Sequence, residues 1–250
     1  MQLKSEHRNF HGLTMLNAYT WSKSIDTGTE IRAGGTAQQS VNNWNLDGEN
    51  RGRSTFDMRQ RFVSSLVYEF PYGRGKTHGN TKSPLAYALG NWQLNTIVSA
   101  NTGLPFTVFS GVDTANSGVG SVMHPDAIKG VSVKPANQTA DSWFNPGAFQ
   151  LAPDCRNAAT FATLSNPLAC FGNLGRDTIS SPGLVNFDLA LLKAFRITEN
   201  HQLQFRTEIF NAFNTPALGF PTNNLSSPTV ARIFSAGPSR QIQFSLRYAF

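Results

Sequence analysis

Apolar and polar residues alternate strictly over the last eleven residues of the chain. Between Arg240 and Phe250 every second residue is apolar, and the residues between them are mostly polar. A period of two places the apolar side chains on one face of a β-strand and the polar ones on the other. The apolar positions are Ile242, Phe244, Leu246, Tyr248 and Phe250. Residues 240–250 are therefore predicted to form a strand with one apolar and one polar face.

The same period recurs in six further segments, more loosely in the earlier ones. The predicted strands span residues 2–8, 13–24, 58–70, 92–108, 184–197 and 202–213. Most are near the 9–11 residues with which a tilted strand crosses a bilayer. The short polar connection 198–201 predicts a hairpin between the last two of these strands. Only residues 83–90 are a candidate for a short helical turn, and they are equally compatible with coil.

The connections between the predicted strands alternate in length. Residues 9–12 and 198–201 make short connections and 71–90 a moderate one, whereas 27–57, 110–182 and 214–239 are long. Up-and-down barrels show this order, because all short turns lie on one side of the membrane and all long loops on the other. We therefore predict an all-β, antiparallel, up-and-down outer-membrane β-barrel segment of about seven strands with long extracellular loops. Each strand should pair only with its sequence neighbours.

The two faces of such strands have different surroundings in a membrane barrel. Apolar residues would face lipid, with Trp21, Tyr68, Trp92 and Tyr248 near strand ends, where aromatic girdles lie. The polar residues of the last three strands would line a water-filled lumen. The lumen-facing candidates are Asn186, Asp188, Gln204, Arg206, Glu208, Gln243, Ser245 and Arg247. In a soluble sheet the same residues would form only its hydrated face.

Composition narrows the class of protein. Charged residues make up 14% of the 250 residues and aromatic residues 11%, with 19 phenylalanines, so the chain is too apolar to be disordered. The formal charge of +6 comes from scattered Lys and Arg, which form no basic run, and no nucleic-acid partner is expected. No apolar run approaches the roughly 18 residues of a membrane helix. Outer-membrane lipid is the expected surrounding.

No catalytic or metal-binding pattern stands out. The five histidines, His7, His11, His78, His124 and His201, have no ligand spacing and are expected to be solvated. The aspartates of the longest loop, Asp113, Asp126, Asp141, Asp154 and Asp177, match no calcium loop and are expected to be solvated too. The aromatics Trp44, Trp143, Phe144 and Phe149 stand isolated in the loops. No enzymatic activity, cofactor or metal is expected.

The chain contains two cysteines, Cys155 and Cys170, in a segment rich in Asn, Pro, Ala and Gly. This arrangement fits one local disulfide formed in an oxidising compartment. Two unrelated reduced thiols remain the alternative.

Several phrases resemble a known family. The terminal strand QIQFSLRYAF resembles the C-terminal signal that the barrel-assembly machinery reads in outer-membrane barrels, with Ile242, Phe244, Leu246, Tyr248 and Phe250 at its apolar positions. Nearly the whole chain resembles the C-terminal barrel half of TonB-dependent outer-membrane receptors of the Oar-like, carboxypeptidase-regulatory-domain-bearing type. The phrases that carry this resemblance are AYTWSKSID (18–26), FDMRQRFVSSLVYEFPYGRG (56–75), GNWQLNTIVSANTGLPFTV (90–108), WFNPGAF (143–149), FGNLGRD (171–177), NFDLALLKAFRITENHQLQFRTEIFNAFNTP (186–216) and SRQIQFSLRYAF (239–250).

The resemblance implies location in the outer membrane of a Gram-negative bacterium and uptake of a bulky, unknown solute through a plugged barrel. It also implies that contact with the TonB complex is made only through N-terminal parts that this sequence lacks. We therefore expect residues 1–250 to be the C-terminal part of such a barrel, without signal peptide, plug or TonB box. Because the smallest such barrels use about eight strands, seven should leave the barrel incomplete. The alternative function is a secreted or surface β-rich adhesion or binding module without transport.

Overall fold

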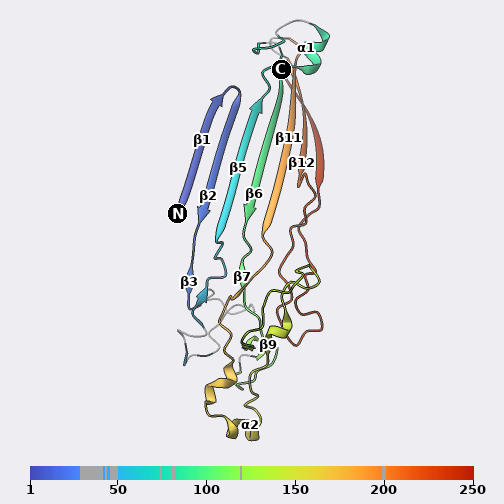
Figure 1. The fold of residues 1–250 in the computed structure, drawn as a ribbon. Helices are drawn as coiled ribbons and strands as arrows, with labels where there is room; N and C mark the ends of the chain where they lie inside the picture. Colours follow the sequence, from blue (N-terminus) through green and yellow to red (C-terminus); the bar gives the residue numbers. More distant parts are fainter. Residues whose placement is uncertain are drawn as a thin grey trace.

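The molecule has an elongated shape, with a sheet of long strands at one end and folded loops at the other (Figure 1). The computed structural model describes residues 1–28, 42, 44–45, 50–73, 75–79, 83–118, 120–198 and 201–250. Among these residues no helix is both long and apolar enough to cross a membrane.

Seven strands form the sheet, and all six pairings between them are antiparallel. In sheet order, which is also chain order, they are β1 (Gln2–Phe10), β2 (Leu13–Trp21), β5 (Gln60–Glu69), β6 (Trp92–Asn101), β11 (Leu184–Arg196), β12 (Gln202–Phe210) and β13 (Gln241–Ala249). The predicted antiparallel meander is therefore confirmed. The sheet is not closed, and β1 and β13 form its two edges.

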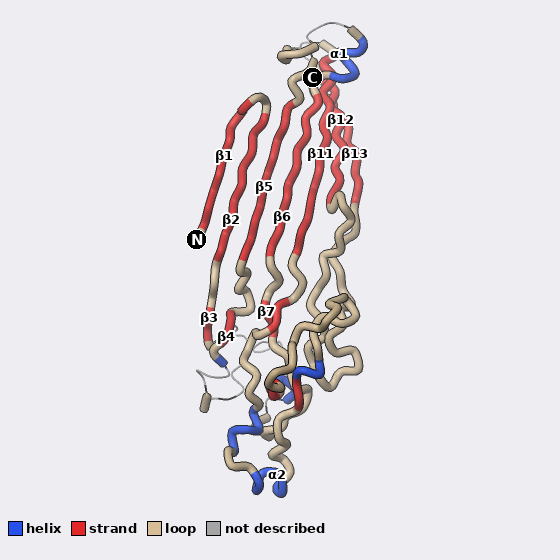
Figure 2. Tube along the Cα trace, in the orientation of Figure 1, coloured by secondary structure: helices blue, strands red, loops and turns tan. Residues whose placement is uncertain are grey.

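The short connections all lie at one end of the sheet (Figure 2). β1 runs to Phe10, two residues further than expected, and a turn at His11 and Gly12 joins it to β2. Both turn residues have positive φ angles, 52° and 85°, as the type I′ turn of a two-residue hairpin requires. The moderate connection at this end contains α1 (Pro84–Leu89), where a helical turn was predicted. Residues Glu199 and Asn200 of the predicted hairpin turn lie outside the described residues.

The strand expected over 92–108 is shorter than predicted, because the chain leaves the sheet after Asn101. The backbone of Gly103 lies so close to Ser181 that any side chain there would clash. Beyond it, β7 (Pro105–Phe106) pairs with β10 (Ile179–Ser180) in a separate small sheet. β2 likewise ends at Trp21 instead of residue 24.

The long loops fold together into what we call the loop domain, residues 22–28, 50–59, 102–118, 120–183 and 211–240. Besides β7 and β10 it holds β3 (Ile25–Asp26) paired with β4 (Gly52–Arg53), and β8 (Asp126–Ala127) paired with β9 (Phe149–Gln150). It also contains α2 (Ala158–Thr163) and 3-10 turns at Gly120–Val122, Pro146–Ala148 and Pro167–Phe171. The expectation that 83–90 was the only helical candidate was therefore wrong. Asn157 caps α2 by accepting from the backbone N–H groups of Ala159 and Thr160.

A hydrophobic core holds the loop domain together. The expectation of isolated aromatics was wrong for Phe144 and Phe149, which lie 1% and 6% exposed in this core, with the Trp143 side chain packed against it. Sequence periodicity could not reveal this core, because its residues come from irregular segments far apart in the chain. The buried members are Phe106, Val108, Phe144, Ala148, Phe149, Leu174, Ile179 and Ala231.

Candidate functional site: the polar face of the sheet

The pairing register gives the sheet two chemically different faces, because directly opposed residues of an antiparallel pair share a face. Between β12 and β13, Phe205 lies opposite Leu246 and Ile209 opposite Ile242 on the apolar face. On the other face, which we call the polar face, the opposed pairs are Gln204 with Arg247, Arg206 with Ser245, and Glu208 with Gln243.

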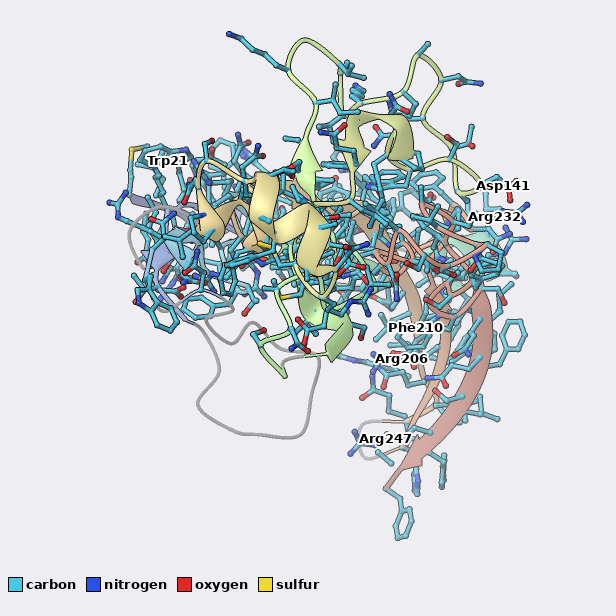
Figure 3. The ribbon with its side chains drawn as sticks, turned by 90° about the horizontal axis from the view of Figure 1, so that it is seen from below. Trp21, Asp141, Arg206, Phe210, Arg232 and Arg247 are labelled. Carbon is cyan, nitrogen blue, oxygen red and sulfur yellow. A yellow bond between two sulfur atoms is a disulfide. The ribbon has the colours of Figure 1, made fainter. Side chains whose placement is uncertain are left out.

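The polar face continues on β11. Ala190 lies opposite Glu208, so Asp188 and Asn186, two and four residues before it, share that face. All eight residues predicted to line a lumen therefore lie on one face of the sheet. Figure 3 looks along the strands and shows the sheet bending round at β12 and β13, with Arg206, Phe210 and Arg247 on the inner side of the bend.

Several side chains of the polar face are bonded to their neighbours. Arg206 forms an ion pair with Glu208, whose second carboxylate oxygen accepts a hydrogen bond from the Gln243 side chain. Nearer the loop domain, Asp188 Oδ1 accepts from Asn186 Nδ2 and from the backbone N–H of Asn211, both at 2.9 Å. The row combines donors and acceptors of both charges, which suits recognition of polar solutes more than a single-sign ion filter.

The edge of the sheet at the loop end, which we call its rim, has a step, and a groove lies there beside the row of polar residues. β11 pairs with β6 over Leu184–Lys193 but with β12 only over Leu189–Arg196. The edge of the sheet at the loop end therefore drops by five residues at β12. A groove of about 420 Å³ fills this step, lined by Asn186, Asp188, Phe210 and residues of the β12–β13 loop. A second hollow of about 200 Å³ continues along the polar face past Asp188, Arg206 and Glu208.

Several residues interrupt the two faces. Asn17 pairs with Ser64 on the apolar face, and Ile97 lies on the polar face opposite Asp188. Sequence reasoning missed Lys193, which lies on the apolar face opposite Trp92 and is 2% exposed. A lysine at an apolar position of an otherwise alternating strand was the available signal.

Charged clusters connect separate segments within the loop domain. Asp57 is buried and accepts from Arg53 Nε and Arg59 Nε, both at 2.8 Å, and from the backbone N–H of Ser24. Burial alone would raise the pKa of Asp57, but the hydrogen bonds from Arg53, Ser24 and Arg59 outweigh it and lower that pKa. Arg53 also donates to Ser180 Oγ at 2.8 Å, which joins the β2–β5 loop to the β6–β11 loop.

Arg176, which lies in the β6–β11 loop, also joins this loop to the β2–β5 loop. Its guanidinium is buried, pairs with Asp26, and donates to the carbonyl of Asn50 at 3.0 Å. Asp177 follows it and is fully buried, bonded to Thr107. The expectation that Asp177 is solvated was therefore wrong: it is bonded to Thr107 within the β6–β11 loop and pairs with Arg176. Its burial also separates it from the exposed Asp141 and the half-buried Asp154.

The expectation that all histidines are solvated was wrong for His124, which is 2% exposed. Its Nδ1 lies 2.8 Å from the carbonyl oxygen of Leu174. Burial, helped by the nearby charge of Arg176, lowers the pKa of His124 to about 4, against the opposing effect of the Leu174 hydrogen bond. In the described part of the chain no group of His, Cys, Asp and Glu is arranged to hold a metal ion.

Cys155 and Cys170 are joined as a disulfide in the structure, with Cα atoms 5.9 Å apart. The bond connects the segment before α2 to the 3-10 turn Pro167–Phe171. It therefore closes the outermost part of the loop domain, as the sequence predicted.

An antiparallel meander with one apolar face, one polar face, short turns at one end and long loops at the other defines a wall of an outer-membrane β-barrel. Comparison with family models gives the same class: the model of an outer membrane beta barrel domain matches residues 1–243. The chain belongs to this family, and its place is the bacterial outer membrane. Neither the comparison with curated proteins nor that with solved structures finds a match.

Proposed function

We propose that this chain is part of a TonB-dependent, Oar-like receptor that binds a bulky solute at the cell surface and takes it up through a plugged barrel. The observation that carries the proposal is the groove of about 420 Å³ in the step of the rim, between the polar face and the loop domain. Its volume falls in the range of ligand sites, and it opens onto the polar row that continues toward the turn end.

The residues of the groove have distinct roles in this proposal. Phe210 gives it an apolar wall, and Asn186 and Asp188 give it polar groups that hydrogen-bond a solute. Arg206 and Glu208 follow as an ion pair that can open toward a solute carrying charges of its own. The loop domain, fixed by its core and by the Arg53 and Arg176 contacts, presents a preformed mouth.

Uptake into cells that produce the protein from its own gene tests the proposal. The probes are fluorescent oligopeptides and oligosaccharides too large for passive diffusion through porins. We expect accumulation that a protonophore abolishes, because the transport is energised from the inner membrane. Asp188→Asn and Arg206→Gln should lower accumulation by about tenfold each, since each removes a charge-assisted contact.

Lys76→Gln is the control, since it removes a positive charge in the connection between β5 and β6, outside both the groove and the polar row, and it should leave accumulation unchanged. Surface binding without accumulation, insensitive to the protonophore, would contradict uptake and favour the adhesion module. Absence of both binding and accumulation for every probe class would leave the groove without its proposed role.

We also propose that β13 is read by the barrel-assembly machinery. All of its residues are exposed, and in the described chain it pairs with β12 alone, so its outer edge presents free backbone groups for strand addition. Phe250→Ala should lower the amount of protein assembled in the outer membrane, whereas Arg247→Ala on the other face should not. Equal assembly of both variants and of the unchanged protein would contradict this proposal.

A further inference from the structure

The helix α1 (Pro84–Leu89) lies against the apolar face of the sheet at the turn end, and three side-chain contacts hold it there. Lys193 Nζ donates to the carbonyls of Tyr87, at 2.7 Å, and Gly90. Trp92 Nε1 donates to the carbonyl of Ala88 at 3.0 Å. Lys193 and Trp92 are directly opposed on the apolar face, so the helix covers that face and not the polar one.

These contacts satisfy the end of the helix without water. The last carbonyls of a helix have no partner within it, and in an apolar medium each unsatisfied group costs several kcal/mol. The carbonyl of Ala86 accepts from the Gly90 N–H at 2.9 Å, and the next two accept from Lys193 and Trp92. The Ser83 side chain caps the first turn by accepting from the N–H of Ala86 at 3.1 Å. Its backbone is thus prepared for surroundings that offer few hydrogen bonds.

The outer surface of α1 is apolar and uncharged. Leu85 and Leu89, one turn apart, are 62% and 52% exposed, and the helix contains no charged residue. Tyr87 is 45% exposed, and its hydroxyl donates to the carbonyl of Arg196 at 3.0 Å. The ring of such a tyrosine combines an apolar body with a bonded polar end, as aromatic residues at membrane interfaces do.

Two aromatic rings of the sheet lie close to the ammonium group of the buried Lys193. Its ammonium lies 5.3 Å from the centre of the Trp92 ring and 5.1 Å from that of Phe195, both on the apolar face. Cation–π contacts of this kind are strongest where water is excluded. Lys193 thus connects the helix to the wall while its charge stays covered from the side that faces lipid.

We propose that α1 is a membrane-interface helix that inserts Leu85 and Leu89 into the periplasmic leaflet of the outer membrane, with Lys193 as the anchor that positions it. The occupant of this surface is lipid, because α1 is held by Lys193 and Trp92 of the lipid-facing side of the sheet. The leaflet follows from the end of the sheet, since short turns of outer-membrane barrels face the periplasm. The proposal does not depend on the solute or on transport.

Single-cysteine variants in isolated outer membranes test the insertion. The native cysteines are paired in a disulfide, so Leu85→Cys, Leu89→Cys or Thr77→Cys adds the one reactive thiol. Thr77 is exposed in the same connection and serves as the control. We expect a membrane-impermeant maleimide to label positions 85 and 89 about tenfold more slowly than position 77. A fluorophore at 85 or 89 should be quenched by nitroxide-labelled phospholipids and not by iodide.

Labelling of positions 85 and 89 as fast as position 77 would overturn the proposal. Slow labelling without quenching by nitroxide lipid would overturn it too, because a protein partner or a second copy would then cover the helix. Lys193→Met in the Leu89→Cys background tests the anchor: labelling should become several-fold faster while heat-modifiable migration shows that the sheet is still folded. Arg196→Met, at the same end of β11, is the matched control and should change nothing. Unchanged labelling in the folded Lys193→Met protein would show that Lys193 does not position the helix.

Discussion

The sheet and the loop domain use apolar residues in opposite ways. On the sheet, Phe244 and Leu246 are 68% and 66% exposed, whereas Phe144 and Met123 of the loop domain are 1% and 0% exposed. The sheet is therefore made to be surrounded by lipid and the loop domain by water, within one chain. The loop domain also has exposed rings, such as those of Phe213 and Phe234, but it buries the side chains of its own core away from solvent.

The regions also differ in what holds them together. The sheet relies on its backbone ladder, with each strand bonded to its chain neighbours. The loop domain has only two-residue strands and depends instead on its aromatic core, a disulfide, and buried charges such as Arg176 and Asp57. Changes to side chains should therefore affect the loop domain more than the sheet.

The largest expected effect comes from emptying the core of the loop domain. Phe144→Ala should cost about 3–5 kcal/mol of the loop domain's free energy of unfolding, because a cavity remains where the ring was. Phe244→Ala should cost only about 0.5–1.5 kcal/mol, the value of an aromatic pair, since lipid fills the space beside Phe205. Hydrogen exchange of the protein in membranes, resolved by peptide, measures both. Equal losses of unfolding free energy in the two variants would contradict the difference between the two regions.

Introducing an arginine on either face of the sheet tests whether the apolar face contacts lipid. Phe244→Arg should cost about 2–4 kcal/mol in a bilayer, whereas Ser245→Arg, its neighbour on the polar face, should cost about 0–1 kcal/mol. Chemical unfolding of the protein from lipid vesicles gives both values. Similar penalties at the two positions would mean that both faces are buried in protein.

The disulfide adds a smaller stabilisation that belongs to the loop domain alone. Replacing Cys155 and Cys170 by serine should cost about 3 kcal/mol there, the loop-closure value for a ring of this size, and should leave the sheet unchanged. Thiol titration of the non-reduced protein should find no free thiol. Two free thiols would show that the pair is reduced.

Acidification should loosen the loop domain through His124. Because its pKa is about 4 when folded and near 6.5 when unfolded, the unfolded state binds the proton first as the pH falls. The stability is complete above about pH 6.5 and is lost progressively down to about pH 4, by roughly 1 kcal/mol at pH 5.5. Protease susceptibility of the loop domain against pH measures this loss. His124→Gln should abolish the dependence in this window, while Asp57, with its lowered pKa, acts only at lower pH.

The sheet could be predicted from sequence because a strand with lipid on one side and water on the other alternates apolar and polar residues with a period of two. Each long strand lies within a few residues of its predicted bounds, except β6, because the chain leaves the sheet after Asn101 and passes close to Ser181 at Gly103. The eight polar-face residues were found for the same reason. The groove beside them was not, because it arises from unequal pairing of β11 with its two neighbours.

The loop domain could not be predicted, because its contacts have no period. His124 and Asp177 are buried by segments about 50 and 70 residues away, through Leu174 and Thr107. The resemblance phrases FDMRQRF and FGNLGRD do contain Asp57, Arg59, Arg176 and Asp177, but only the fold shows that Asp57 and Arg176 belong to charged clusters where the β2–β5 and β6–β11 loops meet. Lys193 is a charged residue at an apolar position of β11, and the helix that it contacts is visible only in three dimensions.

The unequal pairing of β11 also determines how the wall stands in the bilayer. Relative to β6, strand β12 is shifted toward the turn end by five residues at one rim and three at the other. At about 3.4 Å per residue, this is a shift of roughly 10–17 Å between two strands that lie two spacings, or about 10 Å, apart. The rim therefore has a local step at β11 and not an even slope. An upright wall would force the lipid around β12 and β13 out of line with that around β2 and β5, so hydrophobic matching favours strands that lean in the membrane.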